Sequence, residues 1–130
     1  MITGLHALLY SDDAPATRAF LRDVLRWPFV ADDSSGDGWL IFASGPSEVG
    51  VHPTEAEWHG ETHRSPRHHQ VALLCDDVGA TRRELEARGA TFAGDVVDHG
   101  WGLALLVEVP GADPILLYEP RHPVAKDLPR

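Results

Sequence analysis

Short runs of apolar residues alternate along this chain with clusters of Gly, Pro, Asp and Ser. Runs bounded by such turn formers are typical of β-strands and are too short to cross a membrane. The pattern predicts strands in the first half at residues 6–11, 27–31, 38–43 and 48–52. It predicts strands in the second half at residues 70–75, 91–98, 101–109 and 114–119.

Residues 14–25 change to a helical spacing. The apolar positions that recur every fourth residue are Ala16, Phe20 and Val24. An aspartate before this stretch can accept hydrogen bonds from the free amides of the first turn, and Pro15 loses no backbone bond there. We therefore expect a helix over residues 14–25, ended by Trp27-Pro28.

A second helix is expected at residues 78–88, with Gly89 suited to the left-handed position after the last turn. The entries to the two helices match: residues 12–21 and 76–85 share six of ten positions at an offset of 64. A repeat of this kind indicates that one βαβββ unit occurs twice.

The 130 residues suffice for one domain, divided by this repeat into two modules. We assign the first module to about residues 2–53 and the second to about 68–123. The polar stretch 54–67 breaks the apolar rhythm and is predicted to be a connecting loop. Residues 124–130 form a tail.

The charge balance narrows the choice of partners. Eleven Lys and Arg residues against 20 Asp and Glu residues give a net charge of -9, which disfavours nucleic acid and anionic membrane surfaces. The single cysteine, Cys75, forms no internal disulfide and builds no cysteine zinc site. Together with an N-terminus that lacks the features of a signal peptide, these observations predict a cytoplasmic protein.

Each module thus opens with a strand carrying His or Gln, followed by Asp and an amphipathic helix. This arrangement resembles the vicinal oxygen chelate superfamily, which includes glyoxalase I, extradiol dioxygenases and the bleomycin- and fosfomycin-resistance proteins. Residues 38–43, 49–53 and 117–123 are similar to its glyoxalase/bleomycin-resistance branch. The resemblance implies an α+β fold in which two tandem βαβββ modules form a U-shaped, barrel-like mixed sheet around a central cleft. It also implies a homodimer.

The resemblance further implies where a metal would be held. Metal-dependent members use His or Gln on the first strand of each module and Glu on the last. His6 and Gln70 fit the first pair of positions, but Val49 and Leu116 occupy the acidic ones. A divalent cation held by one imidazole and one amide keeps most of its charge uncompensated. We therefore expect no complete metal site and no cofactor.

Three nearby residues keep an alternative metal site open. His52 and Glu119 lie three positions beyond Val49 and Leu116, and His69 lies one before Gln70. Because strand side chains alternate, these odd steps point them to the opposite face unless a bulge intervenes. The further histidines of the linker region, His59, His63 and His68, are read as surface residues.

Aromatic residues complete the expected ligand site. Trp39 and Trp101 follow matching glycines in matching strands and are predicted to wall the cleft. Tyr10 and Tyr118 share the cleft-facing parity and could each donate a hydroxyl group. All four could instead be core or dimer-contact residues.

Two main functions fit these residues. The first is a metal-free protein of the glyoxalase/bleomycin-resistance type that binds or sequesters a small organic molecule, with acidic charge favouring a cation. The second is an enzyme: a lyase or dioxygenase with non-standard metal ligands, or a metal-free isomerase with His6 as its base. A regulatory or partner-binding role is a third possibility, and a fold of this kind does not decide among them.

Overall fold

A computed structural model of the chain describes residues 7, 9, 11–31, 40–48, 50 and 53–129. Its second half forms a four-stranded sheet. The strands are β5 (Ala72–Leu74), β6 (Phe92–Asp98), β7 (Gly102–Val107) and β8 (Ile115–Pro120), in the spatial order β5-β8-β7-β6. β8 is parallel to β5 and antiparallel to β7, which is antiparallel to β6. All four strands predicted for this half are confirmed to within two residues at each end.

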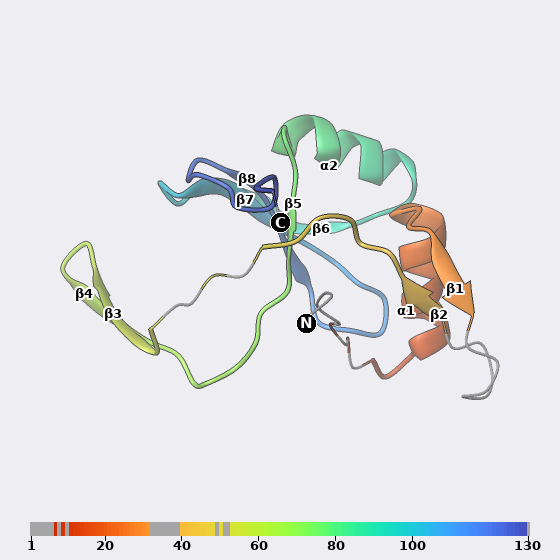
Figure 1. The fold of residues 1–130 in the computed structure, drawn as a ribbon, viewed down its shortest axis with the longest axis horizontal. Coiled ribbons are helices and arrows are strands. Elements are labelled where there is room, and N and C mark those ends of the chain that lie inside the picture. The colour runs from red at the N-terminus through yellow and green to blue at the C-terminus, as the bar shows by residue number, and fades with distance from the viewer. Residues whose placement is uncertain are drawn as a thin grey trace.

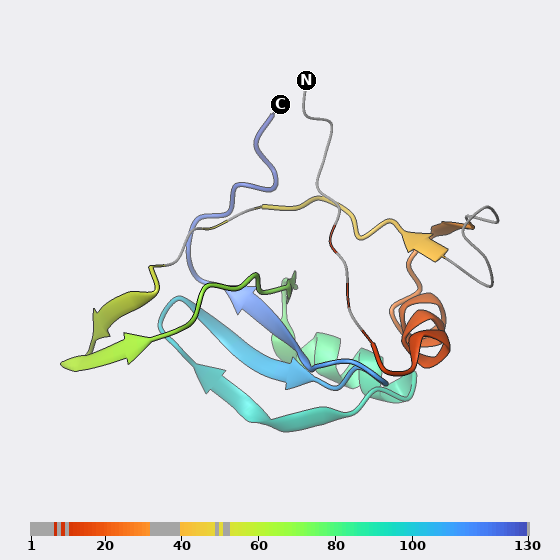
Figure 2. The same cartoon turned by 90° about the horizontal axis from the view of Figure 1, so that it is seen from below.

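Helix α2 (Val78–Ala87) connects β5 to β6 and covers one face of this sheet (Figure 1, Figure 2). It begins where predicted, because the Asp77 side chain accepts a hydrogen bond from the amide of Ala80 at 2.9 Å. It ends at Gly89, whose φ of 98° lies in the left-handed region that glycine adopts without strain. The second half therefore follows the predicted order of strand, helix and three strands.

The first helix is α1 (Ala14–Ala19), continued by the π-helical turn η1 (Phe20–Val24). Asp13 caps it through a 3.1 Å bond from the amide of Ala16. The predicted helix is confirmed, with its last turn widened so that the amide of Leu25 bonds the carbonyl of Phe20 at 3.1 Å. The buried hydroxyl of Thr17 donates to the carbonyl of Pro110, 93 residues away, and ties this helix to the second half.

The core joins the two halves. Phe20 and Leu21 of η1 are buried together with residues of α2 and of the sheet. The buried cluster consists of Phe20, Leu21, Val78, Leu85, Ala90, Leu105, Val107, Val109, Ile115 and Leu117. One apolar cluster shared by both halves fits a single domain.

Strands β1 (Phe29–Ala31) and β2 (Leu40–Phe42) form a separate antiparallel pair. They lie within the strands predicted at residues 27–31 and 38–43 and are shorter than expected. Residues 48 and 50 of the strand predicted at 48–52 are not in a strand, nor are residues 7, 9 and 11 of the one predicted at 6–11. The rest of those two stretches lies outside the described residues.

The linker contains a hairpin, so the loop predicted over residues 54–67 is wrong for most of its length. Strands β3 (Glu55–Trp58) and β4 (Glu61–Arg64) pair antiparallel around a two-residue turn. Both turn residues have positive φ, 51° at His59 and 78° at Gly60, as a type I′ turn requires. The hairpin and the β1–β2 pair lie at opposite ends of the molecule (Figure 1, Figure 2).

Three sheets are thus present in the described part of the chain. The union of both modules in one sheet around a cleft involves segments outside that part and stays a prediction. No helix of the described segments has both the length and the apolar character needed to cross a membrane.

Candidate ligand-binding site

The four-stranded sheet has one face away from α2, which we call the open face. Side chains alternate along strands, and Leu105 and Leu117 lie in the core with α2. Leu116 and Tyr118 of β8 therefore point to the open face. Leu116 pairs in register with Leu106, which is 39% exposed. The open face thus presents hydrocarbon that ends in a phenol.

Four rings form a continuous aromatic row at the edge of the open face: His99, Trp101, Tyr118 and His122. His99 stacks on Trp101 with ring centres 4.9 Å apart and planes within 6°. Trp101 meets Tyr118 edge to face at 5.1 Å and 86°. Tyr118 in turn lies 5.8 Å from His122. Contacts of this geometry hold the indole of Trp101 in place although it is 38% exposed.

Gly102 lets the Tyr118 ring approach β7. A Cβ atom at this position would lie 2.8 Å from the carbonyl oxygen of Glu119 and 3.0 Å from Cδ2 of Tyr118. Both separations are closer than ordinary van der Waals contact. The glycine that precedes the Leu103–Val107 run is therefore part of the site's construction, a role the sequence pattern alone does not reveal.

The turn before Trp101 is held by Asp98. Its carboxylate accepts a hydrogen bond from the amide of Gly100 at 2.9 Å and one from Arg121 at 2.9 Å. The bond from the Gly100 amide is the main reason that the pKa of Asp98 lies below its ordinary value, and Arg121 lowers this pKa further. This exposed network fixes the start of the aromatic row.

The polar end of the row is formed by Tyr118, His122 and Glu48. The Tyr118 hydroxyl lies 3.0 Å from Nε2 of His122, and Nδ1 of His122 lies 2.7 Å from the carbonyl oxygen of Pro123. Burial raises the pKa of the Tyr118 hydroxyl, and the negative charge of Glu48 raises it further. Tyr118 therefore stays protonated at neutral pH.

Glu48 comes from the first half and holds the C-terminal tail. Its Oε2 atom accepts hydrogen bonds from the amides of Ala125 at 2.7 Å and Lys126 at 3.2 Å. The two contacts bridge 77 and 78 residues of chain. The tail is thereby held across the polar end of the aromatic row.

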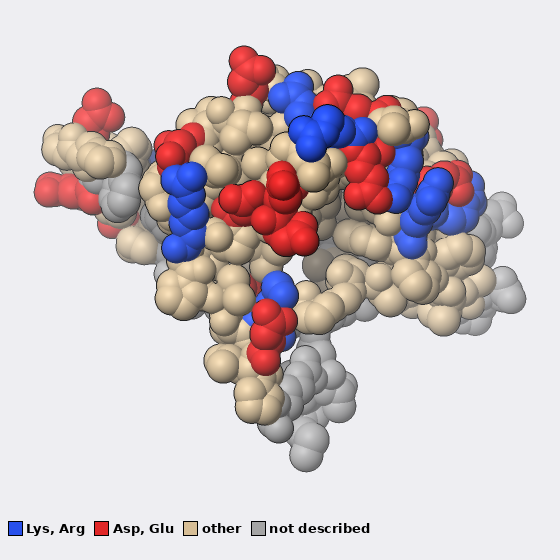
Figure 3. Space-filling view, turned by 90° about the horizontal axis from the view of Figure 1, so that it is seen from above, with Lys and Arg blue, Asp and Glu red and all other residues tan. Residues whose placement is uncertain are grey.

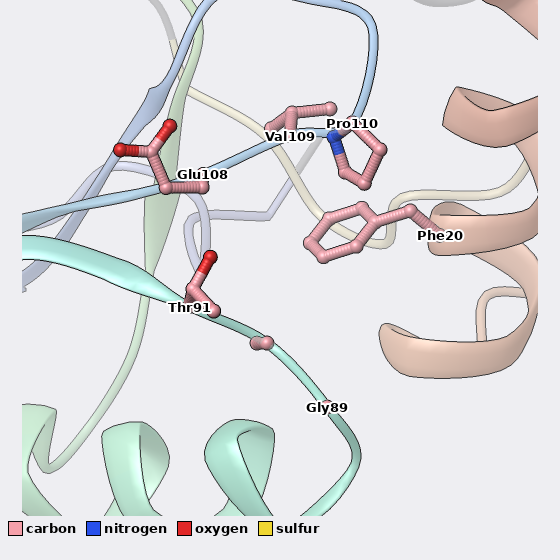
Figure 4. A pocket seen from close by; sticks show the side chains of 7 residues that line it. Phe20, Gly89, Thr91, Glu108, Val109 and Pro110 are labelled. Carbon is pink, nitrogen blue, oxygen red and sulfur yellow. The ribbon is translucent and has the colours of Figure 1, made fainter.

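A separate hollow of about 380 Å³ lies at the other end of β7. It is lined by Phe20, Gly89, Ala90, Thr91, Glu108, Val109 and Pro110. Figure 4 shows Phe20 reaching from η1 toward Pro110, with the carboxylate of Glu108 pointing away from the Phe20 ring. Since β7 spans about 20 Å at ~3.3 Å per residue, this hollow is remote from Trp101. It belongs to the junction of the two halves.

The face shown in Figure 3 mixes both signs of charge. Ion pairs on α2 contribute to this pattern: Arg82 with Glu86 at 3.0 Å, and Arg88 with Glu84. A surface of alternating sign supplies no directed field for a charged partner. The aromatic row is therefore the better candidate for a binding site.

A family model, described as Glyoxalase/Bleomycin resistance protein/Dioxygenase superfamily, matches residues 5–114. The chain belongs to this superfamily. The resemblance seen in the sequence is thereby confirmed, together with the α+β fold class. No curated protein matches the chain in sequence at a significant level.

Two solved structures share the superfamily fold with this chain. Lactoylglutathione lyase from Agrobacterium tumefaciens superposes with a TM-score of 0.56 at 19% identity, over 90% of this chain and 92% of that one. An integron cassette protein from the mobile metagenome of V. cholerae gives a TM-score of 0.50 at 17% identity, over 92% and 98%. At these identities the likeness concerns the fold alone.

The superfamily's metal positions do not carry the donors that a metal needs. Leu116 stands where the resemblance places an acidic ligand, and its side chain has no donor atom. Glu119 points to the other face, as strand alternation predicts, and its Oε1 accepts a bond from the amide of Val78 at 3.1 Å. No group of three His, Cys, Asp or Glu side chains suited to a metal occurs among the described residues. The donors that the structure describes therefore do not fit the four-ligand site.

The structure brings together three of the predicted ligand-binding residues: Leu116, Trp101 and Tyr118. Gln70 precedes β5 with the parity of the open face and is exposed. The remaining predicted residues lie outside the described part of the chain: His6, Tyr10, Trp39, Val49 and, as an alternative metal ligand, His52. His69 is exposed, before β5.

Sequence reasoning missed Glu48, His99 and His122. His99 stands two residues before Trp101, and His122 four residues after Tyr118. Those spacings carry no signal in a strand pattern, because the contacts depend on a turn and on the path of the tail. Cys75 fits its predicted inert role, since burial raises the pKa of its thiol although a bond with Thr81 lowers it.

Proposed function

We propose that this protein binds a small, flat organic molecule on the aromatic row and the open face, without a complete metal site. The observation that carries the proposal is the indole of Trp101, held between two rings yet 38% exposed. A fixed, exposed aromatic surface can be stacked upon with little further loss of conformational entropy. Leu106 and Leu116 extend the same surface with hydrocarbon.

Charge favours a cationic ligand. The net charge of -9 attracts cations toward the protein, and the carboxylate of Glu48 lies near the polar end of the row. A planar aromatic cation therefore combines the two properties that the site recognises. The lyase activity named for the Agrobacterium relative is not part of the proposal, because Leu116 supplies no metal donor.

Calorimetric titration of untagged protein with proflavine, a planar aromatic cation, tests this function. We expect saturable binding, weakened about ten-fold by Trp101→Ala, which removes the stacking surface. Trp27→Phe is the matched control, because Trp27 packs against the core and not in the row; it should bind as the wild type does. Absence of saturable heat, or equal affinity in Trp101→Ala, would refute the proposal.

We also propose that two copies associate in the cytoplasm. On β1, Phe29 is 45% and Val30 64% exposed, an unusual state for adjacent large apolar residues. The chain exposes 9731 Å², whereas a compact monomer of this mass exposes about 6,800 Å². A homodimer that covers β1 accounts for both observations, and the half-buried thiol of Cys75 suits a reducing compartment.

A further inference from the structure

The hydrogen bonds of His122 define which way the Tyr118 hydroxyl points. Nδ1 of His122 lies 2.7 Å from the carbonyl oxygen of Pro123, which can only accept, so Nδ1 carries the hydrogen. In the neutral imidazole, Nε2 can then only accept. The Tyr118 hydroxyl, 3.0 Å away, must donate its hydrogen to Nε2. Toward a molecule on Trp101, Tyr118 therefore presents lone pairs.

Protonation of His122 reverses this arrangement. Both imidazole nitrogens then donate, and the Nε2 hydrogen points at the phenol oxygen. Tyr118 must turn its own hydrogen away from His122, into the space beside Trp101. Burial and Glu48 raise the pKa of the phenol, so the hydroxyl keeps its hydrogen in both states.

We propose that His122 is a positioning residue that makes Tyr118 a hydrogen-bond acceptor toward the ligand when the imidazole is neutral and a donor when it is protonated. The inference rests on the proposed function and deepens it. At neutral pH and above, the site should prefer flat molecules that carry an N–H or O–H group at the edge facing Tyr118. In acid it should prefer molecules that carry a carbonyl group there.

Other charged groups surround the pair without taking over its hydrogen bonds. Glu48 faces it from the first half, with its carboxylate bonded to tail amides. The remaining charged and titratable groups are the ion pair of Arg121 with Asp98, the pair of Lys126 with Asp127, and His99 beyond Trp101. His99 titrates in the same range as His122, so a test must separate the two imidazoles.

Two neutral probes of one shape provide the test. 2-Naphthol offers an O–H donor and 2-acetylnaphthalene a carbonyl acceptor, and neither changes charge between about pH 5.5 and about pH 8, where histidine titrates. We expect the ratio of their affinities to shift toward 2-acetylnaphthalene by about five-fold on acidification, the size of one hydrogen bond. His122→Gln should abolish the shift, and Tyr118→Phe should remove the preference at both pH values. His99→Gln should weaken both probes alike and keep the shift.

The outcomes separate this inference from the proposed function. If both probes bind but their affinity ratio is the same at the two pH values, or shifts equally in His122→Gln, the positioning role is wrong and the binding function stands. If neither probe nor proflavine binds, both are wrong. A readout without ligand is the ¹⁵N spectrum of His122, which should show the Nδ1–H form at about pH 8; the Nε2–H form would contradict the inference.

Discussion

At the scale of single residues, Gly102 is the position where the site tolerates least change. Gly102→Ala would place a methyl group against the Glu119 carbonyl and the Tyr118 ring. Overpacking of this kind should lower the free energy of unfolding by about 1–3 kcal/mol. Urea denaturation followed by circular dichroism measures the change.

Gly79→Ala is the matched control for that substitution. Gly79 lies in α2, and a Cβ atom there meets its nearest neighbours at an ordinary 3.6 Å. Alanine in a helix should raise the free energy of unfolding by about 0.5–1 kcal/mol. If both variants changed stability in the same direction, the tight contact at Gly102 would be disproved.

Asp98 gives the protein a pH dependence whose sign follows from its hydrogen bonds. The fold lowers the pKa of this carboxyl group, chiefly through the Gly100 amide, so ionised Asp98 stabilises the folded state. This contribution is present at neutral pH and is lost as the pH falls below about 4, the ordinary range of aspartate. The melting temperature of Asp98→Asn should therefore lie below that of the wild type at about pH 7.

The same two proteins should converge on acidification. At about pH 3 wild-type Asp98 becomes protonated and resembles the asparagine of the variant. A difference in melting temperature that stayed constant between the two pH values would contradict the assigned role of the Asp98 charge.

At the scale of elements, helix α2 is held at its first turn by two carboxylates. Asp77 accepts a bond from the amide of Ala80 at 2.9 Å and Glu119 one from the amide of Val78 at 3.1 Å. Asp77→Ala should cost about 1 kcal/mol of stability, a typical loss for an N-cap residue. Glu119→Gln should cost less, because its amide oxygen still accepts. Denaturant titration compares them, and a larger loss in Glu119→Gln would contradict the capping role.

Elements of the second half could be predicted because local chemistry and apolar pattern agree there. The Asp77 cap and Gly89 mark both ends of α2, and the strand pattern predicts β6 to β8. The β3–β4 hairpin escaped prediction because Glu55 and Glu57 pair with Arg64 and Thr62, which leaves no apolar alternation. The remaining signal was the glycine of its turn, which a polar loop carries as readily.

The candidate site could be predicted only as far as strand parity reaches. Parity placed Leu116 and Tyr118 on one face and Glu119 on the other. It could not show that His122 meets Tyr118, or that Glu48 approaches from the first half. Those contacts depend on how the tail returns over the sheet, which no periodicity encodes.

At the scale of the whole molecule, the exposed strand β1 predicts association. Val30→Glu places a charge on a surface that a homodimer would bury, so it should shift sedimentation from dimer to monomer. Leu128→Glu is the control: Leu128 is 67% exposed in the tail, away from β1. A monomeric wild type, or a dimer unaffected by Val30→Glu, would contradict an interface at β1.

The central claim is that the superfamily fold here holds an organic molecule where hydrocarbon has replaced an acidic metal ligand. The most direct measurement is the dissociation constant of proflavine for untagged protein, first stripped with chelator and then supplied in turn with nickel, zinc, manganese and ferrous iron. The account predicts the same constant in every sample. Binding that appears only after a metal is added would contradict it.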